Sequence, residues 1–227
     1  MVRSMRIRSF LLRGMMLLLI SVAIPPVLSE EARVSLKWAF LHRSADGATE
    51  IIDFKQRPGP TVTAGDGLRI YLEAGTDVYL YLYLYDAART LHLIFPGDTG
   101  FYDSGPVAGG EIHWLPGSTE WFTWDDSRGR ERFTILASSK RLEELERLTR
   151  RYNDSGGDRS LGSRLYNHIE TLRKENSDWA SVTEKPVAIA GTVRTRGPNS
   201  SKDDLPGEAT LVEADGFYGK PLRLRHE

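Results

Sequence analysis

The segment Val78–Tyr85, with the sequence VYLYLYLY, restricts the possible folds of this chain more than any other segment. Successive residues of a β-strand point to opposite faces, so the segment predicts a strand with Val78 and three leucines on one face. The other face carries a row of four tyrosines, Tyr79, Tyr81, Tyr83 and Tyr85. Neither face is built from charged residues, so both faces need either a covering layer or a binding partner.

The tyrosine row has two interpretations. On a half-exposed sheet it would form an aromatic strip about 20 Å long, which suits stacking against sugar rings or peptide strands. In an inner strand the rings would lie under another layer, with the hydroxyl groups reaching polar partners at its rim. Soluble monomers rarely keep so large an aromatic patch exposed, so we favour the covered strand and keep the exposed strip as the alternative.

The segments on both sides of the tyrosine strand show the same two-residue period. Apolar residues alternate over residues 68–72 and again over residues 91–95, and residues 86–89 supply a turn between the second and third of these strands. Glycine, proline and aspartate interrupt the pattern about every 8–12 residues, which is typical of antiparallel sheets. We therefore predict a mainly β fold, an antiparallel β-sandwich or flattened barrel. The last two apolar segments, EATLVEA and KPLRLRH, are expected to pair as a closing hairpin across DGFYG.

A helical period interrupts the strands at about residues 139–175. The first half has apolar residues at three- and four-residue steps from Leu142 to Tyr152, and the second half repeats this pattern from Leu161 to Leu172. NDSGGDRS separates the halves. The pattern predicts a two-helix insertion before the C-terminal strands, with both apolar faces packed on the sheet.

The first 29 residues have the composition of a secretory signal peptide. Four arginines and no acidic residue precede an apolar run over residues 15–24, which ends at two prolines, and Ser29 supplies the small residue before the expected cleavage point. The run is shorter than the roughly 20 residues of a membrane span, so cleavage is preferred to an anchor. We expect residues 30–227 to form a single exported domain in the bacterial periplasm or secreted beyond it, with no membrane span after cleavage.

Composition narrows the partners of the exported chain. Removal of the four arginines leaves 26 basic and 31 acidic residues, a formal charge of −5, which argues against nucleic acid or anionic lipid as the partner. The chain has no cysteine, so it has no disulfide and no thiol nucleophile. Its stability must come from a packed core, and about 200 residues are enough to build one.

The order of several short motifs resembles the DUF4384 family of exported bacterial proteins, over about residues 60–150. The motifs are a Gly-Asp pair before a strand, a Tyr-Leu-Tyr strand, a Phe-Pro turn, and a Gly-x-Glu entry to a strand that ends in Ala-Ser. They fall on Gly65-Asp66, Tyr79–Tyr81, Phe95-Pro96, Gly129 to Glu131, and Ala137-Ser138. The chain departs from the family pattern at residues 86–89, where glycine is more common, and at Gly97, where asparagine is usual.

The resemblance implies a β-rich exported module and supplies no chemistry, because no catalytic role is assigned to the family. Family members occur alone and also beside peptidase-like or kinase-like domains. This association implies an accessory role for the module.

Three tryptophans, Trp114, Trp121 and Trp124, form a second candidate binding group around the turn at residues 116–118. Trp121 and Trp124 are three residues apart, so on one strand they point to opposite faces. One of them should therefore belong to the core, and the other could contribute to a carbohydrate platform.

Catalytic and metal-binding signatures are absent from the sequence. It contains no Gly-x-Ser-x-Gly elbow, no His-Glu-x-x-His and no phosphate-binding glycine loop. Glu111 and His113 could share a face, but two ligands do not make a metal site. We therefore expect no catalytic residue, no metal and no cofactor.

The favoured function is a non-catalytic envelope module that binds another protein through edge strands and the loops at residues 97–110 and 197–207. The alternatives are a glycan-binding module that uses the aromatic residues and an undetected hydrolase.

Overall fold

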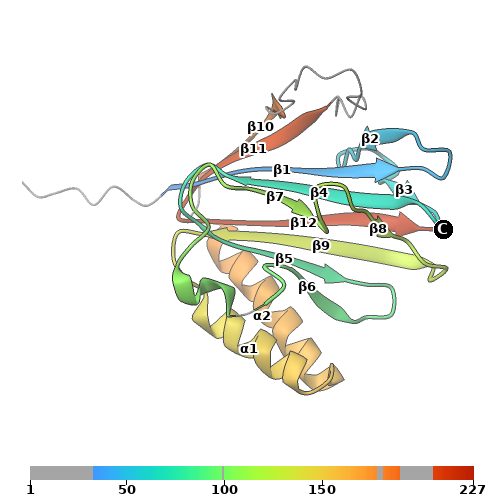
Figure 1. The fold of residues 1–227 in the computed structure, drawn as a ribbon. Coiled ribbons are helices and arrows are strands. Elements are labelled where there is room, and N and C mark those ends of the chain that lie inside the picture. The colour runs from blue at the N-terminus through green and yellow to red at the C-terminus, as the bar shows by residue number, and fades with distance from the viewer. Residues whose placement is uncertain (1–32, 99, 178–180, 190–206) are drawn as a thin grey trace, which may run out of the picture.

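The computed structural model describes residues 33–98, 100–177, 181–189 and 207–227 (Figure 1). The expected signal peptide and most of the loop at 197–207 lie outside these residues. Within them, none of the helices is long and apolar enough to cross a membrane. The described chain forms two β-sheets packed face to face, with two helices packed on one of them.

The first sheet, sheet A, is antiparallel throughout, and β1 and β4 form its centre. The order of its main strands is β10 (Val182–Ala188), β11 (Glu208–Asp215), β1 (Arg33–Arg43), β4 (Gly67–Ala74) and β7 (Ile112–Leu115). Two short strands complete it: β2 (Thr49–Ile51) pairs with β1, and β8 (Phe122–Thr123) pairs with β4.

The second sheet, sheet B, contains the tyrosine strand. Its order is β3 (Thr61–Val62), β12 (Phe217–His226), β9 (Gly129–Ser138), β5 (Tyr79–Tyr85) and β6 (Leu91–Phe95). All neighbours are antiparallel except β3 and β12, which are parallel. The predicted turn at residues 86–89 joins β5 to β6, which pair as a hairpin.

The core lies between the sheets, where the alternating apolar faces of the strands meet. Phe40 of β1 contacts Phe133 of β9 edge to face, with ring centroids 5.1 Å apart. Leu80 and Leu82 of β5 lie on the same inward side and are fully buried. The structure is thus a sandwich, one of the two architectures that the alternation predicted.

The helices α1 (Glu143–Asp154) and α2 (Arg159–Ser177) cover the outer face of sheet B, which is the tyrosine face (Figure 1). Tyr81 and Tyr83 are each 1% exposed beneath them. Both helices precede the C-terminal strands, as predicted. The favoured interpretation of the tyrosine row as a strand covered on both faces is confirmed.

The expected closing hairpin is wrong. β11 pairs with β1 in sheet A, whereas β12 pairs with β9 in sheet B, so the two consecutive strands belong to different sheets. Gly216 joins them with a φ of 69°, a left-handed conformation that glycine adopts without strain. The sharp turn lets the chain cross between the sheets, so that β11 pairs along β1 and β12 pairs along β9 over its full length.

Candidate functional site

The outer face of sheet A carries the surface that best fits a binding role. The helices lie on the opposite side of the sandwich (Figure 1). A small second hydrophobic cluster lies on this face, with buried residues from β1, β4 and β11 and with Trp114 and Trp121 packed against it. The buried members are Ala39, Leu41, Tyr71 and Ala209.

We call the polar and aromatic part of this surface the tryptophan–arginine face, and it consists of Arg43, Arg69, Tyr71, Trp114 and Trp121. The strand register explains how they meet. Tyr71 of β4 is opposite Trp114 of β7, and their rings are 4.9 Å apart. Arg69 lies two residues before Tyr71 on the same side of β4, and Trp121 follows just before β8 on the neighbouring edge.

Two guanidinium groups lie over the ring of Trp121. The Cζ atom of Arg69 is 4.3 Å from the ring centroid, and that of Arg43 is 4.6 Å from it. Arg69 Nε also donates a hydrogen bond to the carbonyl oxygen of Glu120 at 3.0 Å. Such cation–π contacts are worth about 0.5–1 kcal/mol when exposed and more when desolvated, so they hold the arginine forks in place.

Gly67 allows this stacking. A Cβ atom at this position would lie 3.0 Å from Cε3 of Trp121 and 3.3 Å from Nε of Arg43. Both side chains therefore rest on the bare backbone of β4, and any larger residue would push them outward.

A charged group borders the face. Lys37 Nζ is 2.8 Å from Glu73 Oε1, and the hydroxyl of Tyr71 donates to the same carboxylate. Burial alone would raise the pKa of Glu73, but the hydrogen bonds from Lys37 and Tyr71 hold it below its ordinary value. Burial, and then the neighbouring carboxylate, raise the pKa of Tyr71. The face is therefore bordered by the Lys37–Glu73 ion pair, whose carboxylate also accepts a hydrogen bond from the protonated Tyr71.

The three candidate tryptophans do not form one platform. Trp114 and Trp121 share the outer face, whereas Trp124 points into the sandwich, 6.5 Å from Phe133 and 5.6 Å from His226 between ring centroids. The prediction that Trp121 and Trp124 point to opposite faces is confirmed. Trp124 is half-buried and packs against the core, so it is not part of the outer-face surface that Trp114 and Trp121 share.

The tyrosine row is not an exposed strip. The Tyr81 hydroxyl donates to Glu146 Oε1 at 2.7 Å, and the Tyr83 hydroxyl is 2.8 Å from Thr149 Oγ1, so both anchor α1. The outer two are partly buried: Tyr79 packs on Tyr102 and Tyr85 on Tyr166. Tyr81 and Tyr83 therefore have a structural role, since α1 uses their rings and hydroxyls, whereas Tyr79 and Tyr85 are only partly covered.

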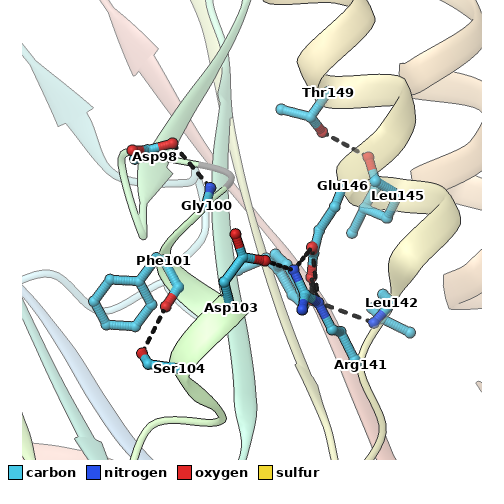
Figure 2. A network of polar contacts seen from close by, with 11 residues as sticks. Asp98, Gly100, Phe101, Asp103, Ser104, Arg141, Leu142, Leu145, Glu146 and Thr149 are labelled. Atoms are coloured by element: carbon cyan, nitrogen blue, oxygen red, sulfur yellow. Dashed lines mark hydrogen bonds and ion pairs between the residues drawn. The ribbon is translucent and has the colours of Figure 1, made fainter.

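A polar network locks the helical layer to the short 3₁₀ turn Phe101–Ser104, here η1. Figure 2 shows Arg141 between Asp103 of this turn and Glu146 of α1. Arg141 Nη2 is 2.8 Å from Asp103 Oδ1 and 2.7 Å from Glu146 Oε2. Tyr102 of the turn is buried and accepts a hydrogen bond from the Leu80 backbone at 2.8 Å, where β5 extends beyond its pairing with β6.

A pocket of about 320 Å³ has three carboxyl groups among its lining residues, those of Asp86, Asp125 and Glu131. Burial raises the pKa of Glu131, and one of its oxygens has no hydrogen-bond partner among the described residues. Asp125 accepts bonds from the backbone and hydroxyl of Ser127, at 2.7 and 3.1 Å, which is a local turn rather than a nucleophile–base pair.

The predicted pairing of Glu111 and His113 is found at 3.2 Å between Oε1 and Nε2. Burial lowers the pKa of His113, and the nearby carboxylate of Glu111 opposes this shift. Within the described ranges, no group of three or more His, Asp or Glu side chains could hold a metal ion.

Sequence reasoning missed Arg43, Arg69 and Tyr71. The signal for two of them was present, because Arg69 and Tyr71 alternate with Leu68, Ile70 and Leu72 and therefore had to face away from the core. Arg43 could not be placed, since only the register between β1 and β4 brings it beside Gly67.

The fold and this surface define a class: an antiparallel β-sandwich with a helical layer on one sheet and an aromatic, arginine-bearing surface on the other. Residues 61–141 match the family model described as a domain of unknown function, DUF4384, which confirms the resemblance to this family over that segment. Searches of curated proteins and of solved structures found no match.

The matched segment runs from β3 to the residues just before α1. It includes β4, β7 and β8, which carry most of the tryptophan–arginine face. The flanking strands β1, β11 and β12 lie outside the match but complete both sheets.

Proposed function

We propose that this protein is an exported, non-catalytic module that binds another protein of the bacterial envelope through the tryptophan–arginine face. Tryptophan, tyrosine and arginine are the residue types that dominate binding energy at protein interfaces. Here they share one side of a sheet whose strands hold them in register. The signal-peptide composition of residues 1–29 supports the export part of the proposal.

The observation that carries the proposal is the stacking of two guanidinium groups over Trp121, at 4.3 and 4.6 Å from the ring centroid. Arg69 is only 7% exposed and donates to Glu120, so it supports the stack from below. The N–H donors that a partner can reach are those of the exposed Arg43, and they fit carboxylates in a forked geometry. We therefore expect a partner surface with acidic side chains beside apolar ones. Ile112, which is 46% exposed on β7, extends the apolar part.

The same stacking makes glycan binding the second candidate. Two half-buried indole rings on one face favour a carbohydrate platform. However, a sugar must stack on an open ring face, and the guanidinium groups of Arg43 and Arg69 already lie over Trp121. Only Trp114 remains as a less encumbered ring, so protein binding is the better fit.

The test is affinity capture from envelope extracts with a tagged chain of residues 30–227, which contains every described element, read by mass spectrometry. Trp121→Ala and Arg43→Ala should each lose the captured protein, because each removes one side of the stack. Arg147→Ala is the matched control: it removes an exposed arginine from α1, whose guanidinium pairs with Glu144 at 2.6 Å.

Two results would contradict the proposal. One is recovery of the same partner by the wild-type chain and by Trp121→Ala in equal amounts. The other is capture of no protein together with retention of the wild-type chain on peptidoglycan or polysaccharide, which would favour the glycan-binding alternative. Circular dichroism of each variant separates lost binding from lost folding.

A further inference from the structure

Four arginines lie together on the outer face of sheet B, at the end of the sheet away from η1. They line a surface pocket of about 560 Å³, whose other lining residues are Gly59, Pro60, Tyr85, Glu131 and Leu224. We call this group the arginine quartet, and its members are Arg130, Arg132, Arg223 and Arg225. It is on the opposite side of the sandwich from the tryptophan–arginine face.

Strand register creates the quartet. In the pairing of β9 with β12, Arg132 is directly opposite Arg223, and Arg130 is directly opposite Arg225. Because side chains alternate, all four project from the same face. Their Cα atoms occupy a grid of about 5 by 7 Å, from the spacing between strands and the rise of two residues along a strand.

Directly opposed like charges destabilise a sheet, so two adjacent arginine pairs need a compensating role. The described residues compensate them only in part. Arg132 Nη1 is 3.7 Å from Glu170, which is closer to Arg173 at 2.9 Å, and Arg225 pairs with Glu227 at 3.1 Å. Arg130 and Arg223 form no ion pair with any residue in the described ranges, so the quartet keeps a net positive charge.

At the edge of the pocket, Tyr166 of α2 fixes the orientation of Arg132. Arg132 donates a hydrogen bond to the hydroxyl of Tyr166 from α2, and its Cζ atom is 5.7 Å from the centroid of that ring. The same ring packs against Tyr85, with centroids 4.8 Å apart. An aromatic wall therefore positions one guanidinium fork, while the exposed members can adjust to a ligand.

We propose that the arginine quartet binds a ligand with two or more phosphate groups. Arginine forks match phosphate oxygens in a bidentate geometry, which lysine cannot reproduce. Four guanidinium groups present more forked donor pairs than one phosphate group needs, so a ligand with at least two anionic groups fits the quartet best. The formal charge of −5 argues against an anionic partner for the exported chain as a whole, but the quartet is a local positive group, and exposed charges beyond about 8 Å are screened at physiological salt.

The experiment titrates the chain of residues 30–227 with tripolyphosphate by calorimetry, and also measures its sedimentation with vesicles that contain phosphatidylglycerol. The double variant Arg130→Gln/Arg223→Gln should bind tripolyphosphate at least about tenfold more weakly, since it removes two charge-assisted contacts. Arg147→Gln on α1 is the control and should bind like the wild type. Sedimentation that depends on the quartet would identify lipid headgroups as the phosphate source, and binding of tripolyphosphate alone would identify a soluble ligand.

A stability measurement keeps the test decisive. In anion-free buffer the double variant should melt at a higher temperature than the wild type, because the opposed charges are gone. Tripolyphosphate should raise the melting temperature of the wild type more than that of the double variant. A double variant that melts lower without anion would show that the quartet is structural. Equal binding by wild type and double variant, equal affinity for citrate and tripolyphosphate, or no binding to either probe would overturn the proposal.

Discussion

The hydroxyl groups of the tyrosine strand can be removed one at a time, and the structure predicts a different cost for each. Tyr81 and Tyr83 are equally buried, at 1% exposure, so replacement by phenylalanine keeps the ring packing in both. Tyr81 donates to the carboxylate of Glu146, and its oxygen accepts a hydrogen bond from the Leu142 backbone at 3.3 Å. Tyr83 meets only the neutral hydroxyl of Thr149.

The expected cost follows from the partner. A hydrogen bond to a charged group contributes about 1.5–3 kcal/mol and a neutral one about 0.5–1.5 kcal/mol. Tyr81→Phe should therefore cost about 2–3 kcal/mol, since it also leaves the Leu142 N–H without its acceptor. Tyr83→Phe should cost about 1 kcal/mol, because the Thr149 hydroxyl keeps its 2.8 Å bond to the Leu145 carbonyl oxygen.

The measurement is urea unfolding followed by tryptophan fluorescence. Tyr85→Phe serves as the control, because the Tyr85 hydroxyl has no hydrogen bond among the described residues, and its cost should be near zero. A double-mutant cycle of Tyr81→Phe with Glu146→Gln should show a coupling of at least about 1 kcal/mol. The reasoning is refuted if Tyr81→Phe costs no more than Tyr83→Phe, or if the cycle shows no coupling.

Further predictions concern titratable and packed residues. Burial raises the pKa of Glu131, so the folded state holds this proton to a higher pH than the unfolded chain, which loses it at about pH 4.3. As pH rises above that value, the wild type should lose stability relative to Glu131→Gln. Burial lowers the pKa of His113, so the wild type should lose stability relative to His113→Gln as pH falls below about 6.5. Urea unfolding midpoints measured across this pH range test both predictions. Parallel plots of midpoint against pH for a variant and the wild type would contradict the prediction for that variant. Gly67→Val should displace Trp121 and Arg43 while the core stays folded, which would appear as a shifted tryptophan emission spectrum with near-normal far-UV circular dichroism. An unchanged spectrum would show that the stack does not depend on the bare backbone.

Local patterns were sufficient for the elements and their faces. The alternation over Val78–Tyr85 identified an inner strand, the three- and four-residue period identified the helices that cover it, and the spacing of Trp121 and Trp124 separated a surface residue from a core residue. These features depend on neighbours in the chain, whose geometry is set by the backbone itself.

What the sequence could not supply is which strands become neighbours. The placement of β11 and β12 in different sheets, the position of Arg43 beside Trp121, and the opposition of Arg132 and Arg223 all depend on pairings between distant segments. Such pairings are decided by the packing of the whole core, because many registers satisfy the same alternation. The sequence by itself thus determined a covered tyrosine strand and a β-rich, helix-backed module, whereas only the tertiary structure assembled its two arginine-bearing surfaces.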